Sequence, residues 1–292
     1  MISVFTPTYN RKYTLPKLYE SLCKQTYQDF EWVIVDDGST DDTNSLIKDW
    51  INENKIKIRY HYQHNSGKSL AHNRGVVESK GDLFLCVDSD DYLLEDSLYN
   101  IYRCWDRVKD YGYIGILGFI IKPDNTPITR MSSNVKDTTY FESYRKNGLH
   151  GDAIMIYNTK IIKKYRFKVA KGEKFIPEGY LYSQLDSEGK LYILRKPLYV
   201  REYLDDGYTK NVAKLIYSNY KSYAHHINTR ITNYDKGIDV FLDSIRYDSV
   251  MIAHKEKGII SKSVYPILAA IGYLPAILIA YKRYGTFMKN PK

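Results

Sequence analysis

Three carboxylates lie within four residues of this sequence, a pattern that could hold a metal ion. Asp88, Asp90 and Asp91 directly follow the apolar residues 83–87. Carboxylates this close repel one another unless a positive group is bound. Mg2+ and Mn2+ prefer carboxylate and phosphate oxygens, and they commonly combine one or two protein carboxylates with substrate phosphates. The pattern therefore predicts a divalent metal that bridges the protein and a diphosphate, with an acidic turn or helix cap as the alternative.

A second acidic group follows another apolar run. Asp36 and Asp37 come directly after residues 32–35 and are followed by Gly38. A carboxylate can only accept hydrogen bonds, so an aspartate here could accept from the imide N–H of a uracil. The alternative is an acidic turn that leads into a capped helix.

Strands and helices alternate over the first 90 residues, and this pattern must position both acidic groups. The expected strands cover residues 2–5, 32–35, 56–60 and 83–87, and the expected helices cover residues 14–24, 41–51 and 68–79. The alternation is typical of an α/β fold with a Rossmann-like, mostly parallel sheet, which binds ligands outside the carboxyl ends of its strands. Polar clusters follow three of these strand ends, so we expect the ligand site at this edge.

The rest of the chain is less regular. Further strands are expected at residues 114–121, 149–156 and 191–194, and the pattern becomes helical from about residue 211. We expect a domain over residues 1–210, with halves 1–100 and 101–210, and a helical C-terminal region over residues 211–292.

Residues 264–281 form an apolar segment of 18 residues without one charge. This is the shortest length for a membrane-spanning helix, and Pro275 lies within it. We therefore expect a kinked in-plane or re-entrant membrane segment, and Lys262 and Lys282 at its edges suit an anionic leaflet. The alternative is a buried helix at a domain or homodimer interface.

Charge and cysteine content limit the function classes. The chain has 43 Lys and Arg against 34 Asp and Glu, a net charge of +9, but residues 1–100 carry 11 and 16, a net of 11 − 16 = −5. An acidic N-terminal part argues against a nucleic-acid binder. Three cysteines form no closed disulfide framework, and residues 1–7 lack the basic leader of a signal peptide, so we expect a cytoplasmic protein.

Several linked motifs over residues 1–92 resemble those of family 2 glycosyltransferases, which have the GT-A fold. The motifs lie at residues 5–11, 21–27, 30–41 and 81–91, in the order and spacing of that family. The resemblance becomes diffuse beyond about residue 110, and the tail is similar to that of bacterial enzymes that build surface polysaccharides. Residues 1–100 are then the nucleotide-sugar-binding half of the catalytic domain, and residues 101–210 are its acceptor-side half.

The resemblance implies a role for each residue that matches a nucleotide-binding motif. Pro7 and Tyr9 would lie at the nucleotide, with the ring of Tyr9 stacked on the base. Asp37 would accept from the uracil imide, and Lys68 would reach the base or a phosphate.

The resemblance also assigns the first acidic group. Asp88 would face the ribose or a metal-bound water, Asp90 would ligate Mn2+ or Mg2+, and Asp91 would support Asp90 at the metal. The metal would neutralise the diphosphate leaving group.

The catalytic base is a carboxylate on the face opposite the leaving group. Family members often place it in an Asp or Glu–Asp pair some 80–100 residues after the metal motif. This sequence has instead a single Glu178 after Pro177, so we choose Glu178, with Glu173 second and Asp152 third.

Two other polar features each allow two interpretations. Residues 203–210 could form a lid that brings Thr209 or Lys210 to the diphosphate, or simply connect two elements. His150 could complete a metal site, although a single histidine is more often structural.

The leading hypothesis is an inverting, metal-dependent hexosyltransferase. It would move a sugar from a UDP-sugar to a hydroxyl of a glycan or lipid-linked glycan in surface polysaccharide biosynthesis, at the cytoplasmic face of the membrane. One alternative is a nucleotidyltransferase, but residues 6–10 lack the glycine-rich phosphate loop expected there. The other is a non-catalytic module that binds sugar nucleotides or glycans.

Overall fold

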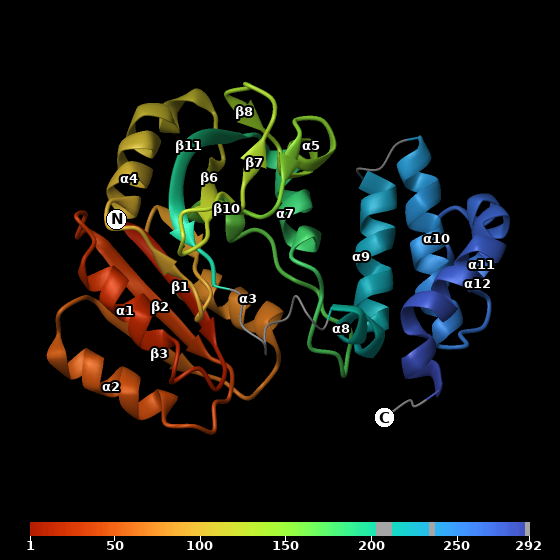
Figure 1. Ribbon diagram of the computed structural model, residues 1–292, viewed down its shortest axis with the longest axis horizontal. Helices are drawn as coiled ribbons and strands as arrows, with labels where there is room; N and C mark the ends of the chain where they lie inside the picture. Colours follow the sequence, from red (N-terminus) through yellow and green to blue (C-terminus); the bar gives the residue numbers. More distant parts are fainter. Residues whose placement is uncertain (203–211, 234–236, 290–292) are drawn as a thin grey trace. The chain divides into compact units, whose positions relative to one another are not determined.

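The computed structural model describes residues 1–202, 212–233 and 237–289 and divides into two compact units (Figure 1). The first unit comprises Met1–Arg166 and Gln184–Leu204, and the second comprises Phe167–Ser183 and Asp205–Lys292, each as far as it is described. Residues 167–183 thus group with the helices, although the expected boundary at residue 210 assigns them to the first domain. The functional division at residue 210 stays a prediction.

The first unit is built on a nine-stranded sheet. Its strands are β1 (Ile2–Thr8), β2 (Phe30–Asp36), β3 (Ile58–Tyr62), β4 (Leu83–Cys86), β5 (Tyr92–Leu93), β6 (Gly115–Ile121), β8 (Asp137–Thr138), β10 (Ala153–Asn158) and β11 (Leu191–Val200). Its order is β3-β2-β1-β4-β10-β6-β11-β5, and β8 pairs with β11. Strands β1 to β4 are parallel, and β10 runs antiparallel to β4 and β6. The prediction of a mostly parallel α/β sheet is confirmed.

Helices and short elements complete the first unit. They are α1 (Leu15–Cys23), α2 (Thr43–Glu53), α3 (Lys68–Glu78), α4 (Ser97–Val108), η1 (Lys109–Tyr111), β7 (Arg130–Met131), α5 (Tyr140–Arg145), β9 (Leu149–His150), α6 (Thr159–Ile162) and η2 (Asp186–Glu188). Helix α7 (Gly179–Leu185) crosses from the second unit into the first.

Alternation along the strands places helices on both faces of the sheet. Val4 and Trp32 belong to one buried cluster with apolar side chains of α1, α2 and α4. Phe5 points to the other face, where a Cβ on Gly75 of α3 would lie 2.2 Å from its ring. Glycine at position 75 therefore lets α3 pack directly on β1. The first helices and strands form as the sequence predicts because their apolar spacing matches this packing.

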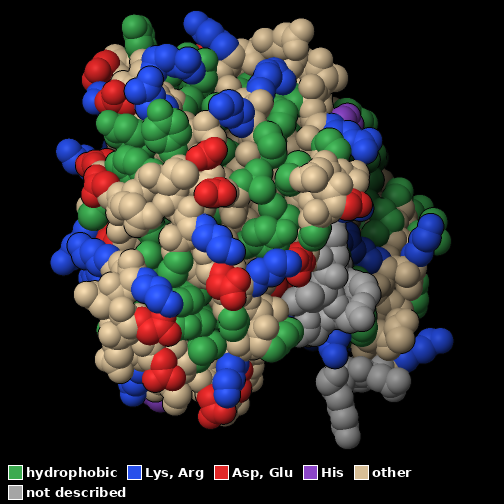
Figure 2. Space-filling model, turned by 60° about the vertical axis from the view of Figure 1, so that its left-hand side comes forward, with side chains coloured by type: hydrophobic (Ala, Val, Ile, Leu, Met, Phe, Trp, Pro, Cys, Tyr) green, Lys and Arg blue, Asp and Glu red, His purple; other side chains and the backbone are tan. Residues whose placement is uncertain are grey.

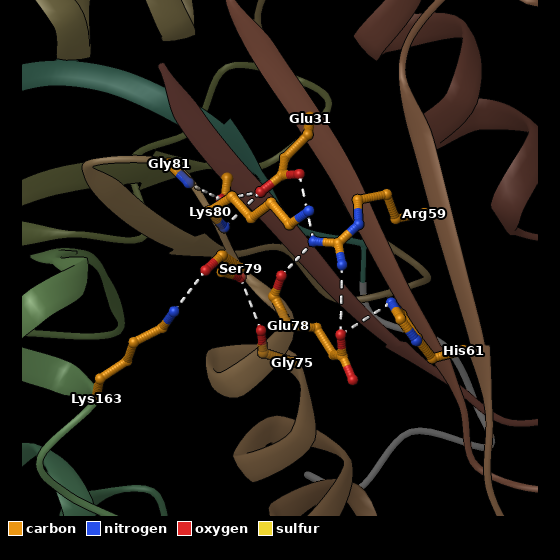
Figure 3. Close-up of polar contacts among 10 residues, drawn as sticks. Glu31, Arg59, His61, Gly75, Glu78, Ser79, Lys80, Gly81 and Lys163 are labelled. Carbon is orange, nitrogen blue, oxygen red and sulfur yellow. Dashed lines mark hydrogen bonds and ion pairs between the residues drawn. The ribbon is translucent and has the colours of Figure 1, made fainter.

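A buried polar network connects the amino ends of the parallel strands (Figure 3). The Glu31 side chain is fully buried and accepts from Ser3 Oγ and from the backbone N–H of Lys80, each at 2.6 Å. Arg59 Nη1 lies 3.5 Å from the same carboxylate and also donates to the carbonyl of Glu78. A buried carboxylate is stable only when it is paired and hydrogen-bonded, so this network fixes where β1, β2 and the end of α3 meet.

Charge is interspersed on the face shown in Figure 2. Acidic and basic side chains alternate there with hydrophobic ones. Acidic side chains are therefore not gathered into one patch on this face.

The second unit is helical. It contains α8 (Val212–Ser218), α9 (Tyr220–Asn233), α10 (Ile238–Ala253), α11 (Ile259–Lys262) and α12 (Pro266–Lys289). Ile227, Val250 and Tyr284 belong to its buried core. Residues 167–183 join these helices because Glu173 accepts hydrogen bonds from the N–H groups of Lys221 and Ser222, at 2.9 and 2.7 Å. A carboxylate at these N–H groups stabilises the start of α9.

Asp248 of α10 should make the second unit more stable at low pH. Its side chain is fully buried, and both of its oxygens lack a hydrogen-bond partner among the described residues. Burial raises the pKa of Asp248 to about 7 from an ordinary value of 3.8. The folded state therefore holds this proton more tightly than the unfolded chain, so stability falls as the pH rises from about 4 to 7.

We expect Asp248→Asn to stabilise the protein by about 1–3 kcal/mol at pH 8 and by much less at pH 5. Thermal unfolding at the two pH values measures this difference, with exposed Asp49→Asn on α2 as the control. An equal effect at both pH values would show that the charge of Asp248 is not the cause.

Helix α12 contains the apolar segment. It is long and apolar enough to cross a membrane by length and composition, and 28% of its most apolar window is buried. It continues through Pro275 as one helix.

Candidate active site

The expected ligand edge is formed by the carboxyl ends of β1, β2 and β4. Thr8 pairs in register with Asp36, and Phe5 with Cys86, so the residues after these strands lie at one edge. Gly38, at φ +86°, makes the turn after β2, and a Cβ there would lie 2.8 Å from the backbone nitrogen of Asn65. The predicted meeting of the strand ends is confirmed by the register.

Tyr9 and Pro7 occupy different environments in this edge. The Tyr9 side chain is 47% exposed. Asn10 follows it at φ 52°, and Asn10 Oδ1 accepts from the Thr40 N–H at 2.7 Å, which fixes the loop that carries the ring. Pro7 is buried inside β1. An exposed ring on a fixed loop is suited to stacking on a base.

Asp37 organises the loop before α3. It is buried and accepts from Gln63 Nε2 at 2.7 Å, from the Ser66 N–H at 2.8 Å and from the Gly67 N–H at 2.7 Å. A carboxylate offers about four acceptor positions, so one position is left beside these three bonds when only the described residues are considered.

Lys68 begins α3 and forms an ion pair with Asp88. Its Nζ lies 2.8 Å from Asp88 Oδ1 and 2.9 Å from Oδ2. Burial opposes ionisation of Asp88, but the charges of Lys68 and Arg201 outweigh it and lower its pKa. Asp88 is therefore a carboxylate at neutral pH, and Lys68 brings a cation to this edge.

Asp90 and Asp91 complete the acidic cluster. One oxygen from each of Asp88, Asp90 and Asp91 can be chosen so that all three lie within 4.8 Å of one another. Burial and the nearby Asp88 raise the pKa of Asp90. Burial, again with Asp88, raises the pKa of Asp91 to about 7. This mutual repulsion is the electrostatic condition that a cation relieves.

Two residues that hold the cluster, Tyr199 and Arg201, were not predicted from the sequence. Tyr199 Oη donates to Asp91 Oδ2 at 2.6 Å and accepts from the Asp88 N–H at 3.0 Å. Arg201 Nε lies 3.4 Å from Asp91 Oδ2, and the Glu202 N–H donates to Asp91 Oδ1 at 2.9 Å. Both oxygens of Asp91 are therefore engaged by the end of β11 and the residues that follow it.

We expect Tyr199→Phe to weaken metal-dependent donor binding about tenfold, because residues behind a metal site commonly contribute 10–100-fold to affinity. The change removes only the hydroxyl that fixes Asp88 and Asp91. Calorimetric titration with Mn2+ and UDP measures it, with Tyr192→Phe, on the same strand, as the matched control. Equal affinities for the two variants would remove Tyr199 from the site.

The donor set fits a hard divalent cation. It consists of carboxylate oxygens, and Asp90 makes no side-chain hydrogen bond or ion pair within the part of the chain that is described. Asp88 and Asp91 are already paired with other groups. Asp90 is thus the carboxylate most available to a metal, as the sequence predicts, and Asp91 is placed to support it.

The candidates for the base lie in different places. Glu178 is exposed and precedes α7 in the second unit, whereas the acidic cluster lies in the first. Glu173 is engaged with the start of α9, and Asp152 forms an ion pair with Arg201. His150 is exposed on β9, and the expected lid at residues 203–210 lies outside the described residues. The role of Glu178 stays a prediction.

A mostly parallel sheet with a carboxylate cluster and an exposed tyrosine at its carboxyl edge defines a nucleotide-sugar enzyme fold of the GT-A type. The model of the family described as glycosyl transferase family 2 matches residues 3–167, more than half of the 292 residues. The chain therefore belongs to the family 2 glycosyltransferases, and the resemblance in its motifs is confirmed.

Similar curated proteins are bacterial glycosyltransferases. Glycosyltransferase GlyA of Streptococcus pneumoniae is 29% identical over 216 residues, which cover 68% of this chain and 30% of GlyA. The GalNAc(5)-diNAcBac-PP-undecaprenol beta-1,3-glucosyltransferase of Campylobacter jejuni is 24% identical over 227 residues, which cover 76% of this chain and 71% of that enzyme. The chain thus spans less than a third of one relative and over two thirds of the other.

The fold is shared with solved structures. The structure of Staphylococcus aureus TarS residues 1–349 in complex with UDP-GlcNAc superimposes with a TM-score of 0.61 over 98% of this chain and 91% of that one, at 17% identity. This likeness supports the GT-A fold and leaves the substrate to other observations.

Proposed function

We propose that the protein is an inverting glycosyltransferase that moves a sugar from a UDP-sugar to a hydroxyl of a glycan or lipid-linked glycan. The observation that carries this proposal is the acidic cluster at the carboxyl edge of the sheet, paired with Lys68 and at the same edge as the exposed Tyr9. Carboxylates that need a cation, next to a lysine and an aromatic ring, are complementary to a nucleoside diphosphate.

The nucleotide would be held by β1, β2 and the start of α3. Tyr9 stacks on the base, with Pro7 in the strand behind it, and the remaining acceptor position of Asp37 takes the uracil imide N–H. The UDP-GlcNAc complex of TarS and the glucosyltransferase of C. jejuni support a UDP-sugar as donor and a glycan on a lipid diphosphate as acceptor. We propose surface polysaccharide biosynthesis as the process that this transfer serves.

Mn2+ or Mg2+, bound by Asp90 with support from Asp91, would neutralise charge on the leaving diphosphate. Other side chains at this edge bind and orient the donor. Lys68 adds a positive charge near the diphosphate, and Asp88, which the structure pairs with Lys68, faces the ribose or a metal-bound water. Tyr199 keeps Asp88 and Asp91 in position while the donor binds.

Glu178 would take the proton from the acceptor hydroxyl as that oxygen attacks the anomeric carbon. Attack from the face opposite the diphosphate inverts the configuration, and the bond to the leaving oxygen breaks as the new bond forms. The carboxylate of Glu178 is exposed, which suits a base that meets an incoming acceptor.

The three cysteines are free, which supports the reducing cytoplasm as the site of this reaction. A homodimer remains a proposal that the size of the protein in solution can test.

Release of UDP from a set of UDP-sugars, with Mn2+ present and after chelation, tests the proposed function. We expect one UDP-sugar to be turned over only with the metal, while GDP-sugars serve as the nucleotide control. A different result would favour the non-catalytic module. In that case a UDP-sugar raises the melting temperature, but no UDP is released even when glycans and lipid-linked glycans are present as acceptors. Absence of both effects would contradict the UDP-sugar assignment.

A further inference from the structure

The outward face of α12 is apolar. An outer stripe of large side chains recurs at helical spacing, and its members are Ile267, Ile271, Leu274, Leu278 and Tyr281, with exposed fractions of 76, 63, 74, 74 and 64%. A helix on the surface of a soluble protein normally turns its polar face outward. A stripe of this length therefore indicates an interaction surface.

The inward face of α12 carries the small residues. Ala269, Gly272, Ala276 and Ala280 are buried. A Cβ on Gly272 would lie 2.8 Å from Ile245 Cγ1, so this face packs closely against α10. The large apolar side chains are thus left for an external partner, while the small ones make the contact inside the unit.

The positive charge around the outer stripe indicates which kind of partner it binds. Residues 249–289 contain six Lys or Arg and one Glu, a net of 6 − 1 = +5. Lys262 precedes the apolar segment, and Lys282 and Arg283 follow it as exposed residues. The one acid, Glu256, is paired with Lys262 at 3.2 Å. An apolar stripe between basic residues is complementary to an anionic lipid surface, whereas a second copy would bring the same positive charges against these.

The packing of α12 against α10 indicates whether α12 lies on a membrane or enters it. Its inner face lies on α10, which carries the buried Asp243 paired with Arg230 at 3.0 Å and with Arg246. A helix bundle with these charges does not enter hydrocarbon, because a charged group there is costly. Tyr265 and Tyr281, 43 and 64% exposed, lie at opposite ends of the segment, as aromatic residues do at membrane interfaces.

We propose that the outer stripe of α12 docks the protein on an anionic membrane, with the helix in the plane of the interface and its basic ends at the head groups. This surface is independent of the proposed transferase activity. It would place the enzyme where a lipid-linked acceptor is found.

Sedimentation of the full-length protein with vesicles tests the proposal. We expect binding to vesicles that contain phosphatidylglycerol and much weaker binding to pure phosphatidylcholine. The double variant Leu274→Glu/Leu278→Glu should bind more than about tenfold more weakly. Lys282→Gln/Arg283→Gln should lose roughly fivefold in affinity per charge and most of the preference for anionic lipid. Tyr111→Glu, at a residue 77% exposed in the first unit, is the matched control and should bind as the wild type does.

Two results would overturn the proposal. If the wild type ignores both kinds of vesicle and forms a dimer that Leu274→Glu/Leu278→Glu dissociates, a second copy covers the outer stripe. If bound protein resists an alkaline carbonate wash, α12 spans the bilayer and does not lie in its plane. Melting temperatures of the variants show whether they are folded, and neither readout depends on glycosyl transfer.

Discussion

Asp90→Asn should reduce metal-dependent turnover of the donor by about 10²–10³-fold or more, since loss of one group that stabilises developing charge has effects of this size. Asp90 is the carboxylate of the cluster that no other described side chain engages. The asparagine keeps the size of the side chain but removes the charge that holds the cation. The free energy of unfolding should not fall and should rise somewhat at neutral pH, because burial and the nearby Asp88 raise the pKa of Asp90 and disfavour its charged form.

Two measurements separate this effect from general damage. Mn2+ binding followed by electron paramagnetic resonance should be lost in Asp90→Asn, and UDP release should fall with it. Asp82→Asn is the matched control. Asp82 is an exposed aspartate just before the start of β4, the strand that leads into Asp90, and it pairs with the N-terminal amine. Wild-type turnover by Asp90→Asn would remove the metal assignment from this residue.

Glu178→Gln should lower kcat by about 10²–10⁴-fold while donor binding is kept, because a positioned general base contributes about this much. The glutamine cannot accept the proton of the acceptor hydroxyl. The Kd for UDP should stay at its wild-type value. Single-turnover measurements with saturating donor give the rate of the chemical step.

The rival carboxylates serve as comparisons. Glu173→Gln should lower the melting temperature through the loss of its two bonds at the start of α9 and should leave kcat nearly unchanged. Asp152→Asn should break the ion pair with Arg201. If Glu178→Gln has a wild-type kcat and Asp152→Asn does not, the base belongs to the first unit.

The N-terminal part of the fold could be predicted because its signals are local. The spacing of Leu15, Leu18 and Leu22 fixes the face of α1, and it matches the cluster that contains Val4 and Trp32. The acidic groups directly follow their strands, so the parallel register alone brings them to one edge.

The contact of Tyr199 with the acidic cluster could not be predicted in the same way. Tyr199 reaches Asp91 across 108 residues of sequence, through the pairing of β11 with β6 and β5. The expected strand stopped at residue 194, because Arg195 and Lys196 interrupt the apolar pattern. The structure continues β11 to Val200 through register shifts on both sides of Pro197. The end of β11, and with it the position of Tyr199, is therefore determined by pairing with distant strands and could not be predicted from local periodicity.

The contact between Tyr199 and the acidic cluster has a thermodynamic consequence. The end of β11 leads directly into the segment from residue 203 onward, while the same tyrosine fixes the backbone of Asp88 and the carboxylate of Asp91. Any second substrate that displaces this strand end changes the affinity for the nucleotide, and by reciprocity the nucleotide changes the affinity for that substrate by the same factor. The affinities for the two substrates would then be coupled through one phenolic oxygen.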